Sequence, residues 1–270
     1  MIYIASALYE EGKSFIEKFR AKKDMTYKRL QVFRGNEAVI IICGTSMIKS
    51  AVNVTEVLCK EDIGEKDFFF NIGICGGQRG KTEKGEIYYI NKITDMTTGK
   101  SYYPSVLYRQ EFKEGEIAAY STEVTDGLIG DISMCDMESA AIYQSAVRFF
   151  ENDRMIFLKT VSDYCDGNYD IVEIKEIIEK ANERIYEWVK RFCCEENNDD
   201  ERIIDEFCRK MRFNENMTRR AKELLLYYEC DGGDIEKFTE EFIKENAIGE
   251  ISGKREGKEY LDRLERKIIQ

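Results

Sequence analysis

Residues 68–77 have the sequence Phe-Phe-Phe-Asn-Ile-Gly-Ile-Cys-Gly-Gly, an apolar run that ends in glycines. A short run of aromatic and aliphatic residues bounded by glycine is typical of a buried strand. On both sides of it, apolar β-branched runs alternate with amphipathic stretches, which indicates strands covered by helices. The sequence therefore predicts an α/β domain with a central sheet flanked by helices.

The same patterns place the neighbouring elements. Before residue 68, the turn Arg34-Gly35-Asn36-Glu37 lies between two apolar runs that we expect to pair antiparallel, so the sheet should be mixed. Strands are predicted at 2–8, 27–33, 38–43, 68–72, 86–92, 117–121 and 155–161. Helices are predicted at 10–20, 47–59, 137–149 and 172–191.

The composition changes at Glu195-Glu196-Asn197-Asn198-Asp199-Asp200, a charged segment that cannot contribute to a core. We therefore predict a domain over 1–194 and a small all-helical extension over 195–270, in which Asp231-Gly232-Gly233 separates two helices. Two helices around a turn could form a DNA-binding helix-turn-helix. Acidic residues outnumber basic ones here, which favours a packing or partner-binding module.

Charge and composition restrict the function. The 270 residues carry a formal net charge of -11, which argues against nucleic acid or an anionic membrane as a partner. No apolar run approaches the roughly 20 residues that span a bilayer, and Met1-Ile2-Tyr3-Ile4-Ala5 lacks the basic start of a signal peptide, so we expect a cytoplasmic protein. The chain has no histidine and nine scattered cysteines. We therefore expect no disulfide framework, metal or His-based triad, and assign acid–base chemistry to other side chains.

Four segments carry candidate catalytic groups. They are Glu10-Glu11 at a predicted helix start, the glycines of 73–77, Asp136 to Ala141 at another helix start, and Ser162-Asp163 at a strand end. Each also has a structural explanation: acids near a helix N-terminus stabilise its dipole, and glycine and aspartate are common in turns and caps. No single segment identifies a function.

Taken in this order, the segments resemble the superfamily of purine nucleoside phosphorylases and methylthioadenosine/S-adenosylhomocysteine nucleosidases. Asp136-Met137-Glu138-Ser139-Ala140-Ala141-Ile142 and Val161-Ser162-Asp163 are the most specific matches. Ala7-Leu8-Tyr9-Glu10-Glu11 looks like the opening acidic motif, and Asn71 to Gly77 looks like the Asn-x-Gly-x-x-Gly-Gly loop. Gly44-Thr45-Ser46-Met47-Ile48-Lys49 is similar to the Ser-Gly-x-Gly-Lys turn, with Ser46 and Ile48 replacing its glycines. The resemblance covers residues 1 to about 192.

The resemblance implies a role for each matching residue. Glu11 would activate water, Glu138 would hold the ribose hydroxyls, Met137 would pack on the sugar, and Asp163 would protonate the purine as a general acid. A surrounding substrate and nucleophile pocket would contain Thr45, Ser46, Gly73, Cys75, Gly76 and Ser162. The resemblance also implies a homodimer or larger oligomer, and no cofactor is expected.

The attacking group separates three hypotheses. Phosphorylases of this kind use an arginine just before the turn equivalent to Gly44-Thr45, whereas residues 39–43 read Val-Ile-Ile-Ile-Cys. Water is therefore favoured, and Lys49 and Arg34 stay as candidate ligands for phosphate. The alternatives are a phosphorylase and a non-catalytic nucleoside sensor that works through its helical tail.

The purine-stacking residues are expected between 77 and 136, where Tyr120 to Val124 is the nearest match. Tyr102-Tyr103-Pro104 could reach the 5' group of a substrate or a partner subunit, but a packing role is favoured, because loop tyrosines usually pack against the protein.

Overall fold

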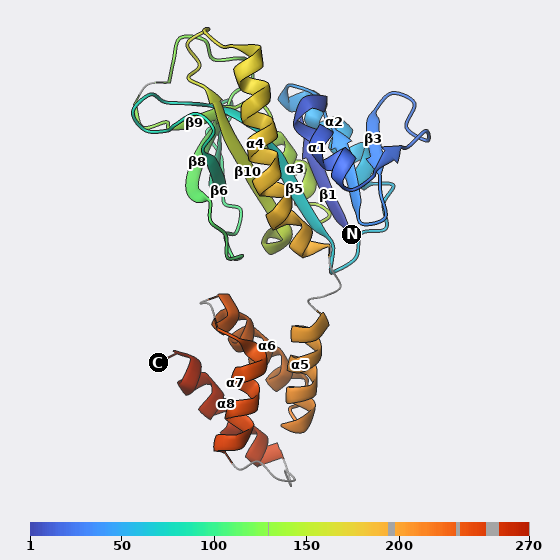
Figure 1. Cartoon of the computed structure of the whole chain (residues 1–270), viewed down its shortest axis with the longest axis vertical. Helices are drawn as coiled ribbons and strands as arrows, with labels where there is room; N and C mark the ends of the chain where they lie inside the picture. The colour runs from blue at the N-terminus through green and yellow to red at the C-terminus, as the bar shows by residue number, and fades with distance from the viewer. Residues whose placement is uncertain (129, 194–197, 231–232, 247–253, 270) are drawn as a thin grey trace. The chain divides into compact units, whose positions relative to one another are not determined.

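The computed structural model describes residues 1–128, 130–193, 198–230, 233–246 and 254–269. Two compact units make up the chain: Met1–Val106 with Gln110–Cys193, and Leu107–Arg109 with Cys194–Gln270 (Figure 1). The predicted boundary at 194–195 and positions 231–232 of the predicted glycine break lie outside the described residues.

The first unit is built on a mixed sheet. Strands β1 (Ile2–Ser6), β4 (Ala38–Ile42) and β5 (Phe68–Gly77) run parallel, with β1 in the centre. Strand β3 (Gln31–Arg34) pairs antiparallel with β4, and β2 (Lys22–Lys23) pairs antiparallel with β3. The predicted antiparallel pair and the mixed sheet are therefore confirmed.

Beyond β5 the sheet closes on itself. Strand β10 (Met155–Asp163) runs parallel to β5 and antiparallel to β6 (Ile87–Asp95), and β6 runs parallel to β8 (Lys113–Ala119). Strand β8 pairs with β9 (Met134–Asp136), which returns to the end of β5. A short strand, β7 (Ser101–Tyr102), extends β6. The carboxyl end of β5 is thus surrounded by the ends of β1, β9 and β10.

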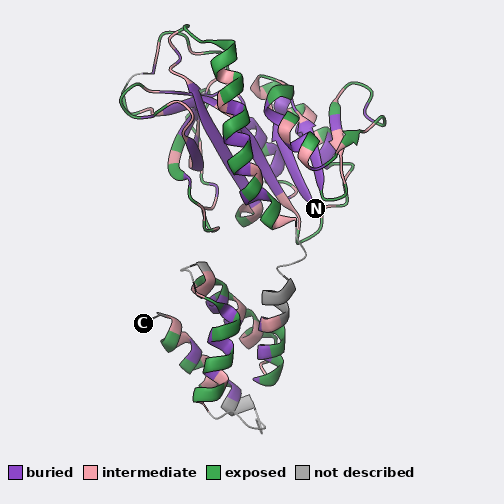
Figure 2. Cartoon of the chain, in the orientation of Figure 1, coloured by how far each residue is buried: buried purple, intermediate pink, exposed green. Residues whose placement is uncertain are grey.

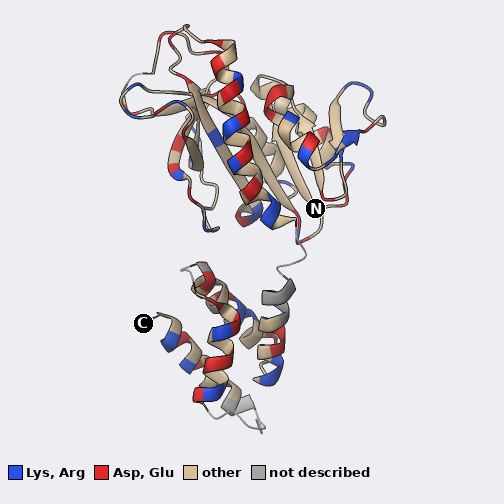
Figure 3. Cartoon of the chain, in the orientation of Figure 1, with Lys and Arg blue, Asp and Glu red and all other residues tan. Residues whose placement is uncertain are grey.

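Two pairs of helices cover the sheet. Helix α1 (Tyr9–Lys18) packs with α4 (Ile171–Val189) on one face, and α2 (Met47–Leu58) packs with α3 (Ser139–Ala146) on the other (Figure 1). Short 3-10 helices lie at Asn152–Arg154 and Lys190–Phe192. Figure 2 shows the central strands almost entirely buried, and Figure 3 shows that charged residues are concentrated on helices and loops. In the described part of the chain no helix has the length and apolar character needed to cross a membrane.

The part of the second unit described beyond residue 197 is helical, as expected. It contains α5 (Asn198–Lys210), α6 (Glu215–Cys230), α7 (Ile235–Glu245) and α8 (Lys254–Ile269). The apolar side chains repeat at helical spacing and form a core of their own, which includes Phe207, Met211, Leu225, Phe242 and Leu264.

The glycine segment 73–77 is not the turn offered as its structural explanation, because β5 continues as a strand through Gly77. Its glycines are required by close packing: an added Cβ would lie 1.9 Å from the Cys165 Sγ at Gly76 and 2.1 Å from the Thr82 Oγ1 at Gly77. Neighbouring side chains therefore occupy the space where these two residues would carry their own.

Candidate active site

Glu11 is a buried carboxylate that links the start of α1 to β5. It is 3% exposed; its Oε2 accepts a hydrogen bond from the Leu8 N–H at 2.8 Å and its Oε1 accepts one from the Ile74 N–H at 2.9 Å. Burial raises the pKa of Glu11, while the charge of Lys159 and the two amides act in the opposite direction. The side chain satisfies an amide at the helix start and also faces β5.

Gly73 leaves the space that Glu11 occupies. A Cβ on Gly73 would lie 2.8 Å from the Glu11 Oε1, closer than real carbon contacts allow. The predicted pocket residue Gly73 is therefore in direct contact with the predicted catalytic carboxylate.

Glu138 lies between β9 and the first residue of α3. It is 7% exposed. Its Oε1 accepts a hydrogen bond from the Ser46 N–H at 2.8 Å, and its Oε2 accepts one from the backbone N–H of the half-buried Met137 at 3.3 Å. Burial, together with the charge of Asp136, raises the pKa of Glu138 to about 7, although Lys159 opposes the shift. Glu138 therefore changes its charge close to neutral pH.

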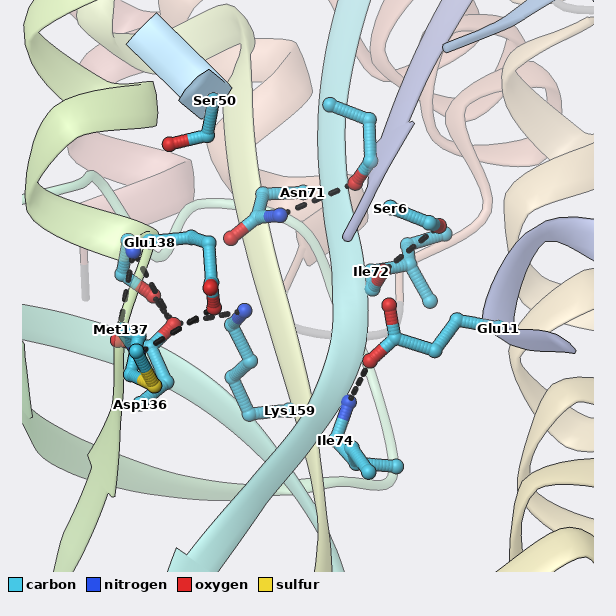
Figure 4. A network of polar contacts seen from close by, with 12 residues as sticks. Ser6, Glu11, Ser50, Asn71, Ile72, Ile74, Asp136, Met137, Glu138 and Lys159 are labelled. Atoms are coloured by element: carbon cyan, nitrogen blue, oxygen red, sulfur yellow. Dashed lines mark hydrogen bonds and ion pairs between the residues drawn. The ribbon is translucent and has the colours of Figure 1, made fainter. Parts of the chain in front are cut away.

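Asp136 and Lys159 form a buried ion pair beside Glu138 (Figure 4). The Lys159 Nζ lies 2.9 Å from the Asp136 Oδ2, and Lys159 is 3% exposed. Asp136 also accepts hydrogen bonds from the backbone and hydroxyl of Ser139, so it satisfies the first backbone N–H of α3. The structural interpretation of this acid is thus correct for Asp136, whereas Glu138 makes no capping bond to α3.

Asp163 ends β10 at the other end of the glycine segment. Its Oδ1 accepts a hydrogen bond from the Cys165 N–H at 2.8 Å, and its Oδ2 lies 2.6 Å from the Ser162 Oγ. The Ser162 Oγ is also 3.2 Å from the carbonyl oxygen of Cys75. A Cβ on Gly76 would lie 3.5 Å from the Asp163 Oδ1, and Gly76 follows Gly73 by three residues, roughly 10 Å along a strand.

The turn before α2 has a backbone conformation that favours glycine. Ser46 has φ 96° and ψ 147°, and it is this strained residue that donates its N–H to Glu138. Ile48 is 79% exposed, so its side chain points to solvent. Thr45 is exposed, and no described hydrogen bond joins it to Glu11, Glu138 or Asp163.

The two candidate phosphate ligands, Arg34 and Lys49, do not form an anion site. Arg34 donates from Nη1 and Nη2 to Glu61 at 3.0 Å and 2.6 Å, and from Nε to Asp24 at 3.3 Å. Its guanidinium is therefore occupied by carboxylates. Lys49 is exposed at the start of α2.

Sequence reasoning missed Lys159, although a single lysine within the apolar run 155–161 was a visible signal. It also missed a small cluster behind Asp163, in which Leu128, Cys135 and Cys165 are buried and the two sulfurs lie 3.3 Å apart. Tyr120 and Val124 pack against this cluster. Two residues of the segment that best matches the base-binding strand end, Tyr120 and Val124, are therefore packed against Cys135 and Cys165.

No protein-family model matches the sequence, and none of the curated proteins compared with it matches. Solved structures do match about two thirds of the chain. The 5'-methylthioadenosine/S-adenosylhomocysteine nucleosidase of Neisseria meningitidis, in complex with methylthio-immucillin-A, has a TM-score of 0.54 at 16% identity over 67% of this chain and 92% of that one. The chain has the fold of these nucleosidases.

Further structures agree on the nucleosidase fold. A putative nucleosidase from Borrelia burgdorferi bound to adenine has a TM-score of 0.57 at 17% identity, covering 71% of this chain and 98% of that one. The Streptococcus pneumoniae nucleosidase in complex with 8-aminoadenine has a TM-score of 0.56 at 19% identity, covering 68% of this chain and 95% of that one. The fold expected from the sequence is therefore confirmed.

Proposed function

We propose that this protein hydrolyses the N-glycosidic bond of a purine nucleoside, as the methylthioadenosine/S-adenosylhomocysteine nucleosidases do. The observation that carries the proposal is the arrangement of Glu11, Glu138 and Asp163 around the carboxyl end of β5. These are the positions at which the sequence resembles the catalytic and ribose-binding residues of that superfamily. The fold comparison supports the proposal independently of these three residues.

The carboxylates of the site match the charges that develop as the glycosidic bond breaks. Cleavage of C1'–N9 leaves positive charge on the ribose and places the bonding electron pair on the purine. Glu11 is desolvated and its pKa is raised, so it can accept the proton of a water whose oxygen attacks C1'. An ionised Glu138 would accept hydrogen bonds from ribose hydroxyls and stabilise the cationic sugar.

Asp163 would protonate the departing base. The Ser162 hydroxyl has a single proton, whereas both the Cys75 carbonyl and the Asp163 Oδ2 lie within hydrogen-bonding distance of it. A hydrogen bond from Ser162 to the Asp163 Oδ2 would hold this side chain in place for proton transfer to the base. The purine would receive this proton at N7 as C1'–N9 breaks, so that water supplies the oxygen and Asp163 supplies the proton.

Water is favoured over phosphate because the site is acidic. Glu11, Asp136 and Glu138 are buried here with one buried cation, Lys159, and that cation is paired with Asp136. A phosphate anion needs cationic or amide donors, and the carboxylates would repel it.

The test is release of free base from methylthioadenosine, S-adenosylhomocysteine, adenosine, inosine and guanosine, with and without phosphate. Asp163→Asn should abolish release, and the exposed Asp153→Asn serves as the matched control that should not. Release that requires phosphate would overturn hydrolysis in favour of phosphorolysis. No release by the folded wild type under either condition would overturn the enzyme and favour a nucleoside sensor.

A further inference from the structure

Lys159 is a buried cation inside β10, whose other residues before the terminal Asp163 are apolar or small and polar. The first eight of the nine residues of β10 are buried, and Lys159 is among them. In the pairing of β10 with β5, Lys159 lies opposite Gly73. Paired residues of neighbouring strands face the same side of a sheet. Since Gly73 has no side chain, Lys159 and Glu11 can share that side.

The charges around Lys159 do not balance. Three buried carboxylates, from Glu11, Asp136 and Glu138, face this one ammonium. Its direct partner is Asp136 (Figure 4). Asp136 is also held by hydrogen bonds from the backbone and hydroxyl of Ser139 at the start of α3. The ammonium is therefore held at a set place, between the group assigned to water activation and the group assigned to ribose binding.

We propose that Lys159 is a positioning residue, whose ammonium is anchored by Asp136 and favours the ionised forms of Glu11 and Glu138 for the reaction. The inference rests on the proposed function and deepens it. Without a nearby cation, desolvation favours the protonated form of a buried carboxyl group. A protonated Glu11 cannot accept the proton of water, and a protonated Glu138 loses part of its capacity to accept hydrogen bonds from the ribose.

The protonation equilibria agree with this arrangement. Burial alone would lower the pKa of Lys159, but the charges of Asp136, Glu11 and Glu138 outweigh burial and raise it. In return, Lys159 acts to lower the raised pKa values of both glutamates.

Two variants should shift the pH profile in opposite directions. Lys159→Met keeps an unbranched side chain of similar length without the charge, so the acidic limb of kcat/KM should move to higher pH and activity at pH 7 should fall at least about tenfold. Asp136→Asn leaves an acceptor for Ser139 but removes the negative charge that raises the pKa of Glu138. The acidic limb of kcat/KM should therefore move to lower pH. Lys159→Arg keeps the charge and should retain the wild-type limb. An unchanged limb in the first two variants would overturn the proposal.

Unfolding supplies a readout that does not require turnover. Without the cation, the native carboxyl groups bind protons more tightly, so the stability deficit of Lys159→Met relative to wild type should grow from pH 5 to pH 8. Folding of the variant at pH 5 but not at pH 8 would also support the charge role. An equal deficit at both pH values would overturn it, because lost packing does not depend on pH. If the wild type releases no base, the proposed function fails while this comparison still decides the role of Lys159.

Discussion

Gly73→Ala should push the Glu11 carboxylate out of place. The new Cβ would lie 2.8 Å from Oε1, 3.1 Å from Cδ and 3.3 Å from Oε2. Ordinary van der Waals contact begins at 3.4 Å, so the carboxylate has to retreat by roughly half an ångström. Its backbone is fixed in the first turn of α1, and its oxygens are held by two backbone amides. The retreat therefore strains those two hydrogen bonds.

The displacement should lower both the catalytic rate and the stability. A misplacement of 1 Å at a reacting group lowers rates by about 100-fold, so half of that should lower kcat by about tenfold. Lost hydrogen bonds to a charged group destabilise by about 1.5–3 kcal/mol each, which sets an upper range for the change in unfolding free energy.

The assay compares kcat for base release by wild type, Gly73→Ala and Gly64→Ala. Gly64 is the matched control, because its added Cβ would meet nothing nearer than the Asp67 Oδ2 at 3.9 Å. A kcat for Gly73→Ala within twofold of the control would refute the placement of Glu11 as the group that activates water.

Three further predictions concern Ser46, Glu138 and the helical unit. Ser46→Gly should maintain or raise the melting temperature, because relief of strain of about 1–3 kcal/mol offsets the added flexibility of the unfolded chain; a clear loss would contradict the strain. The pKa of Glu138, about 7 in the folded protein and about 4.3 in unfolded chains, makes wild-type stability fall as pH rises between these values. The unfolding free energy of Glu138→Gln, measured in urea, should not show this decrease with pH. A decrease as large as that of the wild type would contradict the prediction. Phe242→Ala should lower the stability of the helical unit by about 3–5 kcal/mol, and amide hydrogen exchange in α5–α8 that stays at the wild-type rate would contradict the core described for that unit.

The order of the buried elements could be predicted because their sequences repeat with a clear period. Residues 38–43 and 155–161 are apolar at nearly every position, as strands covered on both faces must be, and 47–59 has helical spacing. The strands β2, β7 and β9 were missed, since two or three residues have no period and are defined by their partners. The strand conformation of 73–77 was also missed, because only the fold shows which side chains press on its glycines.

The candidate site was predictable as a set of residues but not as an electrostatic system. Glu11, Glu138 and Asp163 could be selected as candidates because they lie in short motifs that, taken in order, resemble those of the nucleoside phosphorylase and nucleosidase superfamily. The partner of Lys159 could not be predicted, since Asp136 approaches it only when β9 and β10 both meet β5. The conformation of Ser46 was likewise hidden, because serine by itself does not favour a positive φ.

The most direct test of the central claim follows the oxygen that reaches C1' of the sugar. Methylthioadenosine would be incubated with the protein in phosphate-free buffer made with oxygen-18 water, and the mass of the sugar product measured. Hydrolysis with Glu11 as the base predicts free sugar carrying one heavy oxygen, at a rate that phosphate does not change and that Glu11→Gln abolishes. A sugar 1-phosphate formed only when phosphate is added, or adenine release that persists in Glu11→Gln, would contradict it.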